Sequence, residues 1–180
     1  MDFIKFNCPS HPALQALASK INNEAIISKV PPCALAAIVA RETGGRNVLQ
    51  DGCSPGPGCG VGLTQITAGV NWGYPQNPTF QGYELMDEEQ NLYVAGAFFL
   101  KPAIDQCLAL RAAHADAMQK PILYYAFCAY NAGLGAIIKA LHDNTDPDEG
   151  TTDHYGAGTL AFYDSFVFES HTQEGTPPGV

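Results

Sequence analysis

The chain has 180 residues, of which 46% are hydrophobic, and 18 Asp and Glu against 9 Lys and Arg give a net charge of −9. This length supports one domain with a sizeable core, and the apolar fraction is ordinary for a globular protein, so we do not expect a disordered chain. The acidic balance excludes nucleic acid as a partner, because nucleic-acid binding depends on basic residues that neutralise phosphates. No apolar run reaches the roughly 18 residues of a membrane span, so we expect no membrane insertion.

The N-terminal residues MDFIKFNCPSHP lack the charged and apolar regions of a signal peptide. Six cysteines form an even set that permits three disulfides. Cys53 and Cys59 bracket the short loop SPGPG and are the best candidates for a disulfide. For the other cysteines, disulfides and buried thiols both remain open. The histidines and cysteines show no zinc-binding spacing, so we predict neither a metal nor a cofactor.

Hydrophobic periodicity predicts helices and no strands, so the sequence indicates an all-α single domain. A first helix is expected from about Pro12 to Lys29. A second begins at Pro31–Pro32 and ends at the glycine pair Gly44–Gly45. Asp87 is expected to be the N-cap of a third helix that ends near Cys107. Three more helices are expected: one from Pro121 to near Gly133, one over Leu134–Leu141, and one from about Asp153 to Phe168.

Glu42 is the most informative residue of the second helix. It continues the apolar stripe that includes Leu35 and Val39, at helical spacing. Burial raises the pKa of a carboxyl, which keeps it protonated and able to act as a general acid. Two other interpretations stay open: an ion pair with Arg46 at i+4, which the Gly44–Gly45 break disfavours, and an exposed helix end.

Three further segments carry polar or aromatic groups that suit a binding site. The turn GVGLTQIT sets Thr64 and Gln65 in an apolar run, after a glycine-rich loop. Tyr130 and Asn131 stand at the end of a helix, where they either project into a cavity or, for Asn131, cap the helix. The loop after the turn carries aromatic rings that either stack on sugars or seal the core, namely Trp72, Tyr74 and Phe80.

Three blocks, in this order, resemble the lysozyme-like superfamily of soluble lytic transglycosylases and goose-type lysozymes. ALAAIVARETGG resembles the helix that ends with the catalytic glutamate, which matches Glu42. GVGLTQIT resembles the family's glycine–leucine–methionine–glutamine turn, with Thr64 in place of methionine. AFCAYNAG resembles its alanine–tyrosine–asparagine–alanine–glycine block. The matched residues of the last two blocks are Gly62, Leu63, Gln65, Ile66, Tyr130, Asn131 and Gly133.

The resemblance implies a lysozyme-like catalytic domain with a glycan-binding cleft over residues 31–168. It is preceded by an N-terminal extension and first helix (1–30) and followed by a flexible tail (169–180). It further implies cleavage of the β-1,4 bond between N-acetylmuramic acid and N-acetylglucosamine in peptidoglycan, outside the cytoplasm, by a monomer. An inhibitor or immunity protein is a further partner class. The implied glycan-binding residues are Gly62, Thr64, Gln65, Ile66, Tyr130 and Asn131.

The second carboxylate is the open point of this hypothesis. Goose-type enzymes have aspartates in the glycine-rich loop and just after the glutamine turn. Here Thr67 stands at the second position, and Asp51 lies displaced toward the start of the loop. An inverting hydrolase needs two carboxyls about 6.5–9.5 Å apart. Without Asp51, Glu42 would act alone, as in lytic transglycosylases, or the domain would be a catalytically silent glycan-binding module.

Overall fold

The computed structural model describes residues 4–54, 56–69 and 80–173. Within them the regular secondary structure is helical apart from one short hairpin, which confirms the all-α fold class. None of the described helices is long and apolar enough to cross a membrane. The helices are α1 (Pro12–Gln15), α2 (Ala18–Ser28), α3 (Pro32–Thr43), α4 (Glu88–Val94), α5 (Lys101–Ala113), α6 (Ile122–Ala132), α7 (Leu134–Asp143) and α8 (Tyr155–Gln173), with 3-10 turns η1 (Glu84–Met86) and η3 (Pro147–Gly150).

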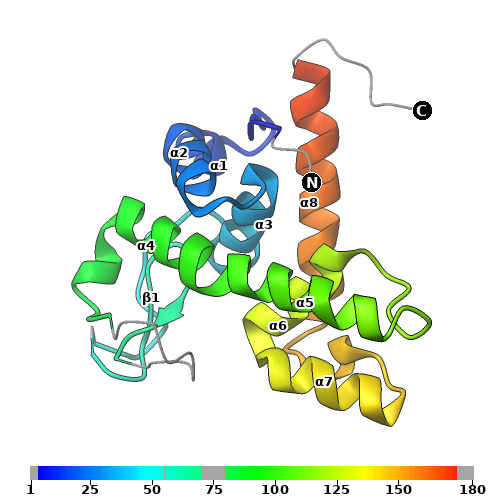
Figure 1. Cartoon of the computed structure of the whole chain (residues 1–180). Helices are drawn as coiled ribbons and strands as arrows, with labels where there is room; N and C mark the ends of the chain where they lie inside the picture. The colour runs from blue at the N-terminus through cyan, green and yellow to red at the C-terminus, as the bar shows by residue number, and fades with distance from the viewer. Residues whose placement is uncertain (1–3, 55, 70–79, 174–180) are drawn as a thin grey trace.

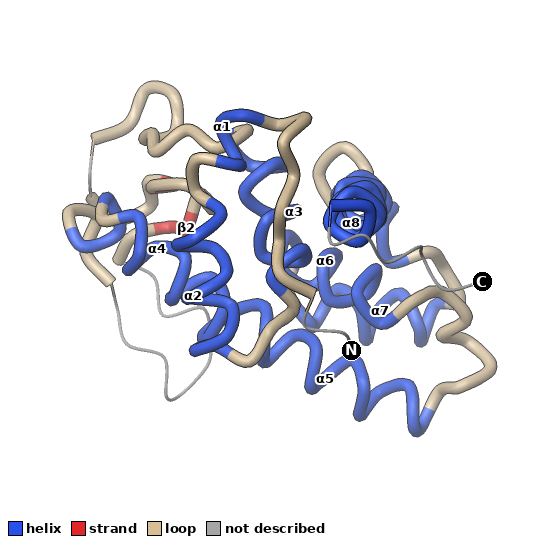
Figure 2. The backbone as a smooth tube through the Cα atoms, turned by 90° about the horizontal axis from the view of Figure 1, so that it is seen from above, coloured by secondary structure: helices blue, strands red, loops and turns tan. Residues whose placement is uncertain are grey.

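Helix α3 is the centre of the core. Every residue from Cys33 to Val39 is buried, and the helix packs against α2 and α8. Figures 1 and 2 show α3 and α8 side by side. The helix begins with Pro32 and ends at Gly44, whose φ of +63° is the left-handed conformation that glycine adopts most readily. The predicted ends of this helix are confirmed.

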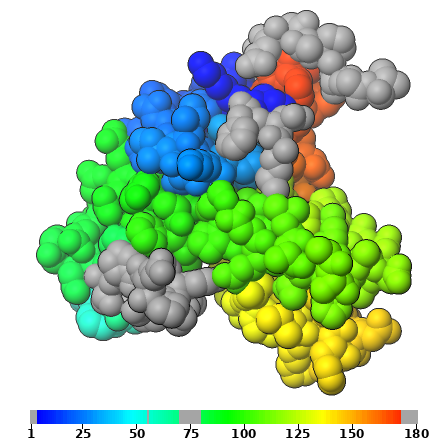
Figure 3. Space-filling view, in the orientation of Figure 1, coloured from blue at the N-terminus to red at the C-terminus, as the bar shows by residue number. Residues whose placement is uncertain are grey.

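Helices α4 and α5 form one long rod, joined by a π-helical segment, η2 (Ala95–Leu100). The rod crosses the face of the molecule seen in Figures 1 and 3. Asp87 caps its start as predicted, because its carboxylate accepts a hydrogen bond from the Gln90 backbone N–H at 2.8 Å. The predicted end at Cys107 was wrong, since the rod continues to Ala113.

The π-helical segment was not predicted. Pro102 has no N–H to donate to the carbonyl of Phe98, and its ring would clash with the preceding turn of an ordinary α-helix. A wider turn just before the proline accommodates the ring without ending the rod. Segments of this kind occur frequently at functional sites, and Phe99 from this one reaches the pocket described below.

Two other predicted helices have different bounds. The first is interrupted, because the Leu17 N–H donates to the carbonyl of Leu14, three residues earlier, and both leucines are buried there. The last begins at Tyr155, because Asp153 and His154 have left-handed backbone, with φ of +49° and +52°. It also runs past Phe168 to Gln173.

The extra turn of α8 holds the N-terminal segment. The Ser10 backbone N–H donates to Glu169 at 2.8 Å, and the Cys8 thiol donates to the same carboxylate at 2.9 Å. Burial, followed by the bond to Glu169, raises the pKa of Cys8 to about 11, so the thiol keeps its proton. Figure 3 shows the N-terminal segment, in dark blue, beside the C-terminal part of α8, in orange to red. Residues 169–173 are therefore part of the fold, not of the predicted tail.

A hairpin of two-residue strands interrupts the helices. Strand β1 (Gly60–Val61) pairs antiparallel with β2 (Ile66–Thr67), and Gly60 lies opposite Thr67. The predicted tight turn GVGLTQIT contains the loop that closes this hairpin. The strands themselves were not predicted, because two residues are too few to show alternation.

A buried amide fixes the hairpin to α4. The side chain of Asn91 is fully buried, and its Oδ1 accepts from the backbone N–H and the hydroxyl of Thr64 at 3.0 and 2.7 Å. Its Nδ2 donates to the carbonyls of Val61 and Leu85 at 2.9 and 3.1 Å. Every hydrogen-bonding group of this amide is satisfied, which is the condition for burying it without a large penalty.

Gly62 allows this close approach, and Gly52 offers a matched comparison. Both have left-handed backbone, with φ of +78° and +80°, but a Cβ would lie 2.3 Å from Asn91 Nδ2 at Gly62 and meets nothing within 4 Å at Gly52. We expect Gly52→Ala to lower the free energy of unfolding by about 1 kcal/mol through backbone strain, and Gly62→Ala by about 2–4 kcal/mol through strain plus overpacking. Chemical denaturation measures both, and equal losses would contradict tight packing of the hairpin on α4.

Candidate functional site

The hairpin, the C-terminal end of α3, segment η2 and the end of α6 enclose a pocket of about 310 Å³. The structure thereby brings together residues that lie almost 90 positions apart in the sequence. The predicted site residues that line the pocket are Glu42, Gln65, Ile66, Tyr130 and Asn131.

Glu42 enters the pocket from the last turn of α3. Its carboxyl is partly buried, and its Oε1 accepts a hydrogen bond from the Tyr155 hydroxyl at 2.6 Å. Burial raises the pKa of Glu42, while the Tyr155 hydrogen bond and the positive charge of Arg41 act in the opposite direction. The net effect keeps this carboxyl protonated to a higher pH than an exposed glutamate, as a general acid requires.

The two alternative interpretations of Glu42 are not supported. The guanidinium of Arg46 donates from Nε to the backbone carbonyl of Thr43 at 3.1 Å. No ion pair within the described residues includes Glu42. The side chain is also not an exposed helix end, because it lies in the pocket wall.

Tyr155 is the main residue that the sequence did not reveal. Its ring stacks on that of Tyr130, with centroids 6.3 Å apart and an interplanar angle of 11°. The Arg41 guanidinium lies 5.6 Å from the ring centroid, a cation–π geometry. Burial, together with the negative charge of Glu42, raises the pKa of Tyr155, so its hydroxyl remains a donor. No local pattern relates this tyrosine to an acid 113 residues earlier.

A second buried carboxylate sets the position of Tyr155. Asp148 accepts hydrogen bonds from the backbone N–H groups of Gly156 and Ala157, at 2.7 and 3.0 Å, at the start of α8. Burial alone would raise the pKa of Asp148, but these bonds and one from the Thr151 hydroxyl lower it overall. The ionised carboxylate thus caps α8 and fixes its first residue next to Glu42.

Tyr130 and Asn131 both link the pocket to neighbouring segments. The Tyr130 hydroxyl donates to the Thr64 carbonyl at 3.1 Å, and its ring meets that of Phe99 edge to face at 6.0 Å. Asn131 Oδ1 accepts from the Thr152 backbone N–H at 3.0 Å. Asn131 therefore has a structural role as well as a place in the pocket, so the two interpretations of this residue do not exclude each other.

The hairpin loop contributes Gln65 to the pocket but not Gly62 or Thr64. Gln65 has a left-handed backbone, with φ of +51°, and its Nε2 donates to the carbonyls of Val48 and Gly62 at 3.0 and 2.9 Å. Thr64 is fully buried against Asn91, and Gly62 packs against the same amide. Of the residues predicted to bind glycan, Gly62 and Thr64 thus lie behind the pocket wall and support it from there.

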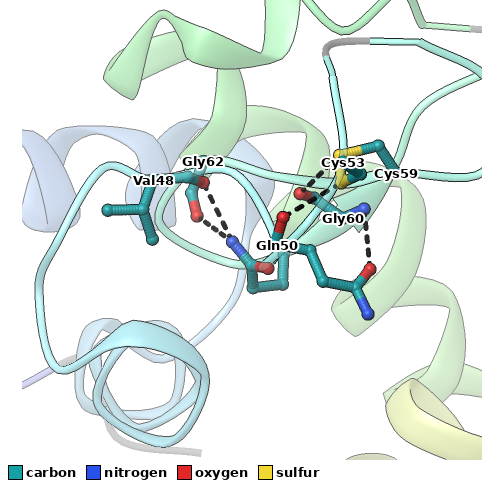
Figure 4. Close-up of a disulfide and its surroundings, with 7 residues drawn as sticks. Val48, Gln50, Cys53, Cys59, Gly60 and Gly62 are labelled. Carbon is teal, nitrogen blue, oxygen red and sulfur yellow. Dashed lines mark hydrogen bonds between the residues drawn. A yellow bond between two sulfur atoms is a disulfide. The ribbon is translucent and has the colours of Figure 1, made fainter.

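The predicted disulfide Cys53–Cys59 is confirmed, with the two Cα atoms 5.8 Å apart. Figure 4 shows it beside Gln50 and Gly60. Asp51 lies in an exposed turn of the same loop and does not line the pocket, whereas its neighbour Gln50 does. The other cysteines are buried thiols: Cys8, Cys33, Cys107 and Cys128.

Four lining residues were not among the predicted site residues: Gln50, Gly60, Thr67 and Phe99. Gln50 and Gly60 form a reciprocal pair. The Gln50 backbone N–H donates to the Gly60 carbonyl at 2.8 Å, and the Gly60 N–H donates to Gln50 Oε1 at 3.1 Å. The cysteine pair indicated a constrained loop, but not that Gln50 and Gly60, which flank this pair in the sequence, line the pocket.

Glu42 is the single carboxyl among the described residues that line the pocket. No group of three or more His, Cys, Asp or Glu side chains in the described ranges is arranged to hold a metal ion. The predicted aromatic residues Trp72 and Tyr74 lie outside the described residues. Phe80 packs edge to face on Phe98, with centroids 5.5 Å apart, which favours a core role for that ring.

Comparison with known proteins assigns no family to this chain. No family model matches it, and a search of curated proteins found no match either. Function is therefore inferred from the residues of the site.

The hydrogen bond from Tyr155 stabilises the charged form of Glu42. Replacing Tyr155 by phenylalanine removes this bond and should therefore raise the pKa of Glu42 further. A carboxyl with a raised pKa in the folded state makes the protein less stable as the pH rises from the unfolded to the folded pKa. In Tyr155→Phe this decline should extend to higher pH.

Carboxyl ¹³C NMR measures the titration, with the Glu42 signal assigned through Glu42→Gln. Tyr83→Phe is the control, because Tyr83 is 74% exposed and no hydrogen bond is seen from its hydroxyl to the described residues. A pKa of Glu42 that stays constant or falls in Tyr155→Phe would contradict the assigned role of the hydrogen bond.

Proposed function

We propose that this protein is a lytic transglycosylase that cleaves the β-1,4 bond between N-acetylmuramic acid and N-acetylglucosamine in peptidoglycan. The observation that carries the proposal is one partly buried carboxyl, Glu42, in a pocket with residues from all three blocks that resemble the lysozyme-like superfamily. The pocket joins an acid, a polar turn and an amide-bearing helix end, and this juxtaposition supports the proposal.

Glu42 acts first as the acid. Tyr155 donates to its Oε1, and the proton is carried on Oε2, from which it passes to the glycosidic oxygen. The bond from that oxygen to the muramyl C1 breaks, and the N-acetylglucosamine side leaves with a free 4-hydroxyl. The raised pKa of Glu42 supports this step, since it widens the pH range over which the carboxyl holds a proton to donate.

Glu42 then acts as the base. The muramyl 6-hydroxyl attacks C1 of the same sugar, its proton returns to Glu42, and a 1,6-anhydro ring results with no water consumed. An intramolecular nucleophile needs no second carboxylate to hold a water. The exposed position of Asp51, outside the pocket, supports this route over a muramidase with two acids.

A catalytically silent glycan-binding module is the second candidate. The single carboxyl in the described lining of the pocket favours this candidate as well, because a site that only binds sugars needs no pair of acids. The raised pKa of Glu42 favours the enzyme. In either case the disulfide supports a location outside the cytoplasm, where disulfides persist. A monomeric state and an inhibitor or immunity partner remain predictions.

Glu42→Gln should lower the rate of peptidoglycan cleavage by at least about 100-fold, because it removes the acid. Asp51→Asn should stay within about twofold of the unsubstituted protein. Release of soluble fragments from purified peptidoglycan, followed by mass spectrometry, measures both the rate and the product. Fragments one water lighter than hydrolysis products are expected.

Glu89→Gln is the matched control, because Glu89 is exposed on α4 and does not line the pocket. Full activity in Glu42→Gln would refute the proposal. Ordinary reducing ends together with a large loss in Asp51→Asn would indicate a muramidase. Binding without any new chain ends would indicate the silent module.

A further inference from the structure

Gln50 presents a fixed hydrogen-bond donor to the pocket. The Gly60 N–H occupies its Oε1 at 3.1 Å, and its own backbone N–H is held by the Gly60 carbonyl at 2.8 Å. The Cys53–Cys59 disulfide closes the loop between these two residues. Figure 4 shows the Gln50 amide with its oxygen toward Gly60 and its nitrogen on the far side. Nε2 makes no hydrogen bond to the described part of the chain.

The other two amides of the pocket have complementary arrangements. Asn131 has its Oδ1 occupied by the Thr152 N–H, so its Nδ2 is the group left for a ligand. Gln65 is reversed: its Nε2 donates to two backbone carbonyls of its own loop, so its Oε1 is left. The lining therefore offers amide donors from Gln50 and Asn131 and an amide acceptor from Gln65.

Gly60 brings the two glutamines together. A Cβ on this residue would lie 3.0 Å from Gln65 Oε1 and 3.1 Å from Gln50 Oε1, so both amides reach across the bare glycine backbone. The two amides thus lie on one wall of the pocket, where Gln65 offers its Oε1 as an acceptor and Gln50 offers its Nε2, on the side of its amide away from Gly60, as a donor. Ile66 and Phe99 add apolar surface to the same pocket.

This pattern fits an acetamido group. Such a group has a carbonyl oxygen that accepts, an N–H that donates and a methyl that prefers apolar surface. An anionic ligand group fits less well, because the described lining offers no Lys or Arg to pair with it and the chain carries a net charge of −9.

We infer that Gln50 is a ligand-recognition residue, whose Nε2 donates to the carbonyl oxygen of a sugar acetamido group. The inference rests on the proposed function and adds to it a residue that selects N-acetylated sugars. The backbone pair with Gly60 and the disulfide hold this donor in place before the ligand binds, which reduces the entropic cost of the contact.

The test compares two neutral β-1,4 tetrasaccharides, that of N-acetylglucosamine and cellotetraose, which has hydroxyls in place of the acetamido groups. Calorimetric titration uses the full chain with Glu42→Gln, so that no turnover occurs. We expect tighter binding of the N-acetylated tetramer. Adding Gln50→Glu should weaken that binding about fivefold or more and leave cellotetraose unchanged, because one hydrogen bond to the acetamido group is lost.

Gln50→Glu keeps an oxygen for the Gly60 N–H, so the loop is retained while the donor is removed. Gln50→Met is the uncharged second variant and should have the same effect on the preference. Gln119→Met, at an exposed glutamine outside the pocket, is the control. If the N-acetyl preference survives both Gln50 variants, the inference is overturned while the proposed function stands. If the chain binds neither tetramer, both are overturned.

Discussion

The hydrogen bond from Tyr155 to Glu42 is the interaction on which the site depends. Helix α3 is apolar and buried over most of its length, so a carboxyl at its end needs a polar partner within the protein. Helix α8 supplies one, and the same helix packs along α3. The packing of α8 on α3 therefore also places the hydroxyl of Tyr155 where it affects the pKa of Glu42. Asp148 caps α8 with its carboxylate and thereby fixes Tyr155, the residue that donates to Glu42.

The opposite wall of the pocket depends on α4. Two-residue strands do not form a stable hairpin alone, so the hairpin takes its stability from a neighbour. The buried amide of Asn91 provides this, and the disulfide restrains the loop on the other side. The pocket thus lies between a rigid helical pair and a loop region held by two specific restraints. Such an arrangement keeps polar groups such as Gln50 and Gln65 in defined orientations without a sheet beneath them.

Local signals predicted the fold well. Proline at the start of α3 and glycine at its end gave its bounds, and the spacing of Cys53 and Cys59 indicated their disulfide. The residues that were missed depend on contacts between distant segments. Tyr155 and Gln50 have no periodicity or spacing that points to Glu42. Gln50, which lines the pocket, is the direct neighbour of Asp51, which the sequence suggested as a second acid. The π-helical segment η2 was missed for another reason: Pro102 lies within an otherwise regular helical pattern, and the sequence does not show whether a proline ends a helix or widens one turn of it.

The separation between Glu42 and Tyr155 has a consequence for synthesis of the chain. Translation at about 5–20 residues per second covers this separation of 113 positions in roughly 6 to 23 seconds. During that interval α3 lacks its main packing partner, because α8 has not yet been made. The acid and its tyrosine come together only when α8 has left the ribosome. A nascent chain that stops before α8 can contain every residue of the three blocks and still lack the environment that prepares Glu42 for proton transfer.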